Sequence, residues 1–453
     1  MRVPAGGKVV EVDPRSEFAL CFGPGGAPAA RRRGRGRRAG GGGTASGRGM
    51  MPEGPVAAHD PVRRILWARG LRDFGDGLAA VVLPAHLVAL GFGAAEVGAV
   101  ATIALFGSAM MTLGAGIAGG RADPRLLLLL AAGLMAATGL GFAVAGGFAV
   151  IAAVALIGTI NPSAGSVSVF APLEQALLTH ASPDAGRTAV FARYSLVGAL
   201  AAAAGALAAG GPDALAALGV PRPAALQSMF LLYALLGVAC AAAYWAIPPL
   251  PGAERQARHA PLGPSRGIVV RLAALFSVDS FAGGLAVQSL LALWLFERFG
   301  LSLAEAGLFF FWSGVLSAFS FPVAAWLAAR IGLVNTMVWT HIPSSLCLIA
   351  AIFAPTAGLA LGLLLLRAAL SQMDVPTRTS YVMAVVTPAE RTAAASFTAV
   401  PRSLAAAASP ALAGALLSAG YADLPFVACG VLKIIYDFAL LAAFRHIKPP
   451  EER

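Results

Sequence analysis

Long apolar stretches, separated by short polar segments, recur along most of the chain. A membrane-spanning helix needs about 20 mostly apolar residues, so we interpret each stretch as one span. The expected spans are 66–89, 95–119, 126–146, 148–177, 189–210 and 226–247, then 268–296, 304–329, 333–354, 357–385, 393–418 and 424–445. The pattern predicts an all-α membrane protein with twelve transmembrane helices.

A polar, proline-rich segment, PPLPGAERQARHAPLGPSR, divides these spans six and six. We therefore expect an N-terminal six-helix bundle over 61–247, a cytoplasmic central loop over 248–267, a C-terminal six-helix bundle over 268–447 and a cytoplasmic tail over 448–453. The long fourth stretch contains Asn161-Pro162 and Pro172. Proline interrupts helical hydrogen bonding, so a kink or a tilt is expected there.

Composition supports lipid as the surrounding solvent. Hydrophobic residues make up 58% of the 453 residues and charged residues only 12%, whereas soluble domains contain about 25% charged residues. Mean hydropathy is +0.76. The sequence contains no phosphate-binding G-x-x-x-x-G-K-[ST] loop, H-E-x-x-H motif or nucleophile elbow. These features argue against direct use of ATP and against an enzyme, and we expect no cofactor.

The first 60 residues differ from the rest, because they contain RRRGRGRR and GGGG and few large apolar side chains. We expect a disordered Arg/Gly-rich tail. Two alternatives are a mis-assigned start, with translation beginning at Met50 or Met51, and a basic arm that touches anionic lipid. The four cysteines lie far apart, without the spacing of a metal site or a disulfide framework.

Basic residues are distributed unevenly over the loops. With both termini in the cytoplasm, the inner loops contain Arg121, Arg125, Arg187, Arg255, Arg258, Arg266, Arg330, Arg391, Arg445 and Lys448. The outer loops contain little more than Arg222 and Arg298. This asymmetry follows the positive-inside rule, and it explains the net charge of +11 better than nucleic-acid binding does. We expect a multi-pass protein of the inner (cytoplasmic) membrane.

The two groups of six spans resemble each other. LGFGAAEVG (90–98) aligns with FGLSLAEAG (299–307) at an offset of 209, and Arg121 aligns with Arg330 at that offset. SPDAGRTA (182–189) aligns with TPAERTAA (387–394). Duplicated six-helix halves are typical of transporters whose substrate site lies between the halves, with alternating access by rocking.

The loop GIAGGRADPR (116–125) is similar to the loop motif of the major facilitator superfamily, G-x(8)-G-x-x-x-D-R-x-G-R-R/K. Gly107 and Gly116 have the required gap, and Arg121 and Arg125 stand at basic positions. Gly120 replaces the usual Asp, and Asp123 replaces the usual Gly. If the usual Asp pairs with a neighbouring helix end and so holds the outward-facing state, this latch is weakened or rebuilt here. The twelve spans and the repeat extend the resemblance over nearly all of 61–447, in a branch of unknown substrate. SPALAG (409–414) is loosely similar to an antiporter motif.

Charged residues inside the expected spans mark candidate sites, since each costs about 2.5–3.5 kcal/mol at the bilayer centre on insertion scales. The first span carries Asp73 and Asp76, which share a helix face. Asp279 occupies the middle of the seventh span, the counterpart of the first. We expect proton or substrate coupling at these carboxylates; the alternatives are an ion pair of Asp73 or Asp76 with Arg69 or Arg72, and an interhelix ion pair for Asp279.

Two further spans carry arginines. The tenth span contains Arg367 and Asp374, with Arg378 nearer the cytoplasm, and the eleventh contains Arg402. Arg367 and Arg402 either bind an anionic group of the substrate or neutralise Asp279 and Asp374 as buried pairs.

Gating residues are expected near the cytoplasmic ends of the spans, namely Arg121, Asp123, Arg125, Glu174, Arg193 and Arg330. A Glu174–Arg193 ion pair is one candidate gate. Lys433 and Asp437 are four residues apart, which favours a local ion pair. His86 is expected to be a packed or cavity histidine.

These observations favour a secondary transporter of a small organic solute, with proton-coupled efflux by an antiporter as the leading hypothesis. Proton-coupled uptake by a symporter is the alternative, and a non-transporting receptor or scaffold is the rival from another class. We expect a monomer that binds its solute, protons and lipid, but no metal and no nucleic acid.

Overall fold

A computed structural model gives the fold of residues 61–118, 123–163, 168–181, 187–248, 263–387 and 390–446. These residues are helical, with short connections. The N-terminal half contains α1 (Pro61–Ala89), α2 (Ala94–Ala118), α3 (Pro124–Val144), α4 (Phe148–Ile157), α5 (Phe170–Ala181), α6 (Arg187–Ala208), α7 (Gly211–Ala217) and α8 (Arg222–Trp245). The C-terminal half contains α9 (Arg266–Leu285), α10 (Gln288–Phe299), α11 (Leu303–Ile331), α12 (Leu333–Ile352), α13 (Ala357–Ser371), α14 (Asp374–Val385), α15 (Arg391–Ser418) and α16 (Leu424–Phe444).

Among the described residues, ten helices or joined helices are long and apolar enough to cross a membrane. Helix α1 carries several charges along its length, and α4 and α5 are individually short, so neither region meets that criterion. With α1 and the α4–α5 pair, the chain has the twelve crossings that the hydrophobic pattern predicts. The tail 1–60, Arg121 and most of the central loop lie outside the described residues.

Three of the twelve crossings are interrupted. The fourth is divided between α4 and α5, in the region where Asn161-Pro162 predicts a kink. The seventh breaks at Ala286 and Val287 and the tenth near Gln372, two breaks that were not expected. A further short helix, α7, follows α6 and was not expected either.

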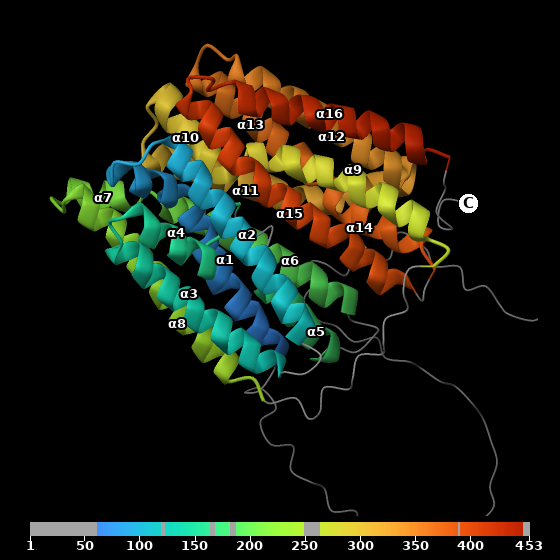
Figure 1. Cartoon of the computed structure of the whole chain (residues 1–453), viewed down its shortest axis with the longest axis horizontal. Helices are drawn as coiled ribbons and strands as arrows, with labels where there is room; N and C mark the ends of the chain where they lie inside the picture. The colour runs from blue at the N-terminus through green and yellow to red at the C-terminus, as the bar shows by residue number, and fades with distance from the viewer. Residues whose placement is uncertain are drawn as a thin grey trace, which may run out of the picture. The chain divides into compact units, whose positions relative to one another are not determined.

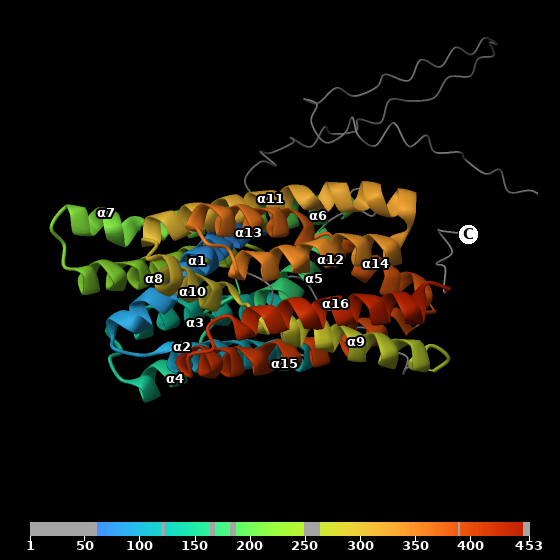
Figure 2. The same ribbon diagram turned by 90° about the horizontal axis from the view of Figure 1, so that it is seen from above.

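The two halves pack closely at one end of the helices, which we call the closed end. It contains the start of α2 and the end of α15, which lie side by side in both views (Figure 1, Figure 2). A Cβ atom added to Gly98 would come within 2.8 Å of the Cα of Gly414, so only small residues permit this crossing. Backbone N–H groups of Ala95 and Ala411 donate to side chains of the opposite half at 2.8 Å.

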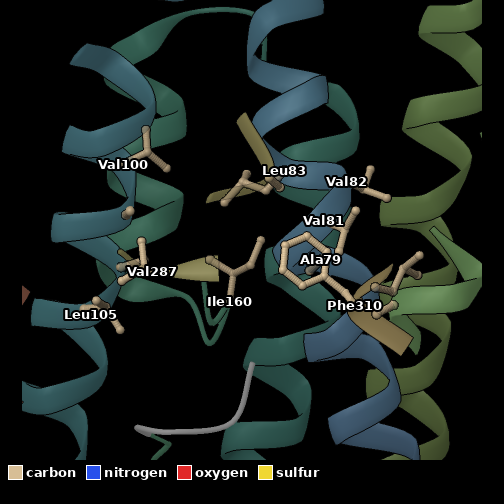
Figure 3. Packing of buried hydrophobic residues seen from close by; sticks show 14 of the residues in the cluster. Ala79, Val81, Val82, Leu83, Val100, Leu105, Ile160, Val287 and Phe310 are labelled. Carbon is tan, nitrogen blue, oxygen red and sulfur yellow. The ribbon is translucent and has the colours of Figure 1, made fainter. Parts of the chain in front are cut away.

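An apolar cluster joins the halves behind this crossing. Its residues include Val81 and Leu83 of α1, Val100 of α2, Val287 beside α10 and Phe310 of α11 (Figure 3). Buried residues of both halves therefore belong to one continuous apolar cluster.

Toward the other end, which we call the open end, α2 and α15 have more exposed surfaces. Phe106 and Leu113 of α2 are exposed, as are Phe397 and Val400 of α15, whereas Ala407 and Ala413 farther along α15 are buried. The close crossing of Gly98 with Gly414 lies at the closed end.

Candidate functional site

A cluster of buried charges surrounds α1 in the N-terminal half. The Arg72 guanidinium donates to Glu174 Oε2 of α5 at 3.0 Å. The hydroxyls of Tyr194 and Tyr244 donate to Glu174 at 2.6 and 2.5 Å. Glu174 is fully buried, and its carboxylate is stabilised by three charge-assisted or hydroxyl hydrogen bonds from three other helices. Helices α1, α5, α6 and α8 are thus joined at one carboxylate.

Asp73 completes this first cluster by pairing with two arginines. Its carboxylate lies 2.7 Å from Arg69 Nε, one turn earlier, and 3.1 Å from the Arg72 guanidinium. Arg69 also lies over the Tyr194 ring. Two cations and two carboxylates therefore neutralise one another, so Asp73 and Glu174 occupy a balanced network. The sequence-based alternative of an ion pair for Asp73 matches this arrangement.

Asp76, one turn beyond Asp73, has different surroundings. Its side chain is 2% exposed, and the Tyr233 hydroxyl donates to Oδ1 at 3.3 Å. Thr159 Oγ1 lies 3.4 Å from the same hydroxyl. Among the described residues, no cation forms an ion pair with Asp76. A buried carboxylate without a cation is costly, so this carboxyl group requires a proton or another positive charge.

The C-terminal half contains a second cluster, centred on Asp279 of α9. Lys433 of α16 donates to Asp279 Oδ1 at 2.6 Å, and Arg378 of α14 donates to Oδ2 at 2.8 Å. Arg378 also contacts Asp374 in the first turn of α14. Asp279 and Asp374 are thus held in ion pairs within one half, which corresponds to the interhelix alternative for Asp279.

His341 of α12 extends this second cluster, although sequence reasoning did not select it. Its Nδ1 lies 3.1 Å from both carboxylate oxygens of Asp437, and its Nε2 lies 3.3 Å from Lys433 Nζ. The expected local pair of Lys433 with Asp437 is therefore wrong, because Asp279 and His341 attract these side chains across the bundle. A histidine inside an apolar span was the sequence signal that could have identified it.

Arg402 and Arg367 do not neutralise Asp279 or Asp374, contrary to one of the two expectations for them. Arg402 Nε donates to Ser280 Oγ of α9 at 3.2 Å. Both arginines are half-buried, and within the described part of the chain neither forms an ion pair with a carboxylate. Arg378 and Lys433 form the ion pairs with those carboxylates instead.

The expected gating residues are dispersed. Glu174 pairs with Arg72, and the Arg193 side chain is exposed, so the expected Glu174–Arg193 pair is wrong. The adjacent residue, Tyr194, is the one that contacts Glu174. Asp123 Oδ1 accepts from the Arg125 backbone N–H at 2.9 Å and caps α3. The Arg125 guanidinium lies over the Trp245 ring.

Arg330, the counterpart of Arg121, lies at the open end of α11. Its guanidinium is 4.1 Å from the centre of the Trp326 ring. Arg121 itself lies outside the described residues, so the latch that the loop motif implies stays a prediction.

Comparisons with known proteins identify the family. The model of the Major Facilitator Superfamily matches residues 65–366 and 272–453. An uncharacterised membrane protein of Saccharomyces cerevisiae is 24% identical over 329 residues, which cover 64% of this chain and 72% of the yeast protein.

Solved structures of transporters share the fold. The nucleoside transporter NupG superposes with a TM-score of 0.67 at 17% identity, covering 85% of this chain and 100% of NupG. The inward-open xylose transporter XylE from E. coli has a TM-score of 0.68 at 14% identity, covering 86% of this chain and 98% of XylE. Together with the family match, these likenesses make the chain a secondary transporter and not an enzyme, and it belongs to the Major Facilitator Superfamily.

Proposed function

We propose that this protein exports a small organic solute carrying a positive charge, in exchange for protons, by alternating access. The observation that carries the proposal is Asp76, a buried carboxyl group whose described partner is the Tyr233 hydroxyl. The nearby cations are committed elsewhere, since Arg69 and Arg72 pair with Asp73 and Glu174.

The surroundings of Asp76 suit the exchange of one positive charge for another. A protonated carboxyl group is neutral and stable in an apolar environment, and a cationic solute would compensate the ionised form instead. Because the proton and the solute would compensate the same negative charge, binding of one favours release of the other. Such competition produces antiport, and a proton gradient directed into the cell then drives the solute outward.

The arrangement of the halves supports alternating access. Close contacts between α2 and α15 are at the closed end, and the positive-inside distribution of loop charges predicts that this end faces away from the cytoplasm. On that orientation the structure corresponds to an inward-facing state, in which solute reaches the site from the cytoplasm.

Uptake by symport is the second candidate, and Arg402 favours it. This arginine is half-buried and hydrogen-bonded to Ser280, without a described carboxylate partner. An anionic solute that binds Arg402 together with a proton would be transported with the proton and not against it.

Reconstituted vesicles test the proposal. With an acidic interior, the wild type should accumulate quaternary organic amines, which have no neutral form that crosses lipid, as protons leave; Asp76→Glu should retain this response while Asp76→Asn loses it. Glu297→Gln, a change at an exposed carboxylate, serves as the reconstitution control. Amine transport that ignores the pH gradient, or that keeps the same response in Asp76→Asn, would refute proton exchange at Asp76. Accumulation of organic acids with protons moving in the same direction would establish the symport candidate instead.

A further inference from the structure

His341 sits between an acid and a base inside the second charge cluster. Its Nδ1 faces the Asp437 carboxylate at 3.1 Å, and its Nε2 faces Lys433 Nζ at 3.3 Å. The Asp279 carboxylate lies just beyond, 3.9 Å from Nε2. The side chain is 3% exposed, so these contacts are made without competition from bulk water.

The two contacts specify the tautomer of His341. A lysine ammonium only donates hydrogen bonds, and a carboxylate only accepts them. Lys433 must therefore donate to a lone pair on Nε2, and the proton of the neutral ring must be on Nδ1, where it is donated to Asp437. In this state Lys433 is shared between His341 and Asp279.

We propose that His341 is a second proton-binding site and that its proton changes the partner of Asp279. A proton that binds the Nε2 lone pair turns this acceptor into a donor and places two positive groups 3.3 Å apart. Lys433 then leaves Nε2, and the new N–H group turns to Asp279 Oδ1. No covalent bond other than the new N–H bond is made or broken.

The surrounding charges fit this exchange. Titratable or charged groups face the cluster from four helices: Asp279 from α9, Asp374 and Arg378 from α14, Arg402 from α15, and Cys429, Lys433, Tyr436 and Asp437 from α16, while Arg367 of α13 faces Cys429. Asp279 and Asp374 form ion pairs with Arg378 and Lys433, and Asp437 accepts the proton of the neutral His341 ring. A protonated ring adds one positive charge near the Asp279 carboxylate, which lies 3.9 Å from Nε2.

The Tyr436 hydroxyl is a new hydrogen-bond partner for the displaced Lys433 ammonium group. This hydroxyl is buried and has no hydrogen-bond partner within the described residues, and the tyrosine ring packs edge-on to His341. Tyr436 is three residues from Lys433, on the same helix face. In the N-terminal half a tyrosine of the last helix also joins a buried polar group, since Tyr233 donates to Asp76 of the first helix.

Nitrogen-15 NMR of histidine-labelled full-length protein in lipid tests the site directly, without transport. The His341 signals, identified by their loss in His341→Gln, should show the Nδ1–H tautomer at pH 8.5 and a doubly protonated ring at pH 5. His86 is the internal control: its Nε2 lies 3.1 Å from the Phe142 carbonyl oxygen, so it should show the opposite tautomer. An Nε2–H tautomer for His341, or a ring that stays neutral down to pH 5, overturns the proposal.

Lys433→Met provides a second arm of the test. Removing the ammonium that opposes a proton on Nε2 should increase the doubly protonated fraction of His341 at pH 7. An unchanged fraction would show that Lys433 does not compete with the proton, which contradicts the exchange of partners.

The role of this site in transport rests on the proposed proton coupling. If His341 binds a second proton in each cycle, His341→Gln should still respond to a pH gradient but accumulate about tenfold less solute per pH unit. Equal accumulation by the variant and the wild type would exclude His341 from the cycle and leave coupling at Asp76 intact. A wild type without any gradient response would instead refute the proposed function.

Discussion

Asp73 and Asp76 lie one turn apart on α1 and nevertheless have different chemical surroundings. Their spacing predicts a shared face, and both are indeed buried. The sequence offers Arg69 or Arg72 as partners for either carboxylate, but it does not predict that both pair with Asp73 and leave Asp76 to Tyr233. Local pairs of this kind can be recognised from spacing, whereas partners from distant helices cannot, as for Asp279 and Lys433.

At this scale Tyr244 gives a direct prediction about stability. Tyr244→Phe removes one hydrogen bond to the buried Glu174 carboxylate and should destabilise the protein by about 1.5–3 kcal/mol. Thermal unfolding in detergent measures this, with Tyr421→Phe at an exposed site as the control. Equal unfolding temperatures of the Tyr244 variant and the wild type would show that this bond does not stabilise the fold.

Helices were easier to predict than their interruptions. The observed outer boundaries agree with the expected spans to within five residues, because the apolar runs end at polar or glycine-containing turns. The breaks in the seventh and tenth crossings nevertheless have local signals that were not used. Gly283-Gly284 precede the first break, and Pro376 lacks the N–H group that would bond to the Gln372 carbonyl at the second.

The crossing of α2 and α15 predicts the effect of added volume. Gly98→Val should push the helices apart, since the nearest atoms to a new Cβ are backbone atoms of Pro410 and Gly414. Spin labels at the exposed positions Val88 and Tyr421, in a background without other cysteines, should then report longer distances across the closed end. Gly114→Ala, where a Cβ meets nothing within 4 Å, is the control. Unchanged distances in Gly98→Val would contradict the close crossing.

Glu390 joins the segment before α15 to the start of α9. The hydroxyls of Ser265 and Thr387 donate to its carboxylate at 2.6 Å, and the Gly263 N–H donates to it as well. These bonds lower the pKa of Glu390 from 4.5 to about 2. Because the folded pKa lies below the unfolded value, this stabilisation is complete above about pH 4.5 and is lost as the pH falls toward 2.

Replacement of Glu390 tests this linkage. Glu390→Gln should lower the unfolding temperature at pH 7, and the difference from the wild type should shrink between pH 5 and pH 3. A constant difference for Glu390→Gln down to pH 3 would contradict the assigned hydrogen bonds.

The whole molecule combines two similar halves whose charge clusters are different. The repeat, the number of crossings and the family could be predicted from the sequence, because hydrophobic period and loop motifs are local features. The conformation could not, since it depends on contacts such as those of Gly98 with Gly414. In the N-terminal half Asp76 lacks a described cation, whereas in the C-terminal half Asp279 has two. This asymmetry is the reason why we propose proton and solute exchange at Asp76.

The most direct measurement is proton release when solute binds to purified protein in weakly buffered detergent solution. An amine identified by the vesicle screen should release about one proton from the wild type near neutral pH. Asp76→Glu should do the same, and residual binding to Asp76→Asn should release none. Solute binding to the wild type without proton release, or equal release from Asp76→Asn, would contradict exchange at this carboxyl group.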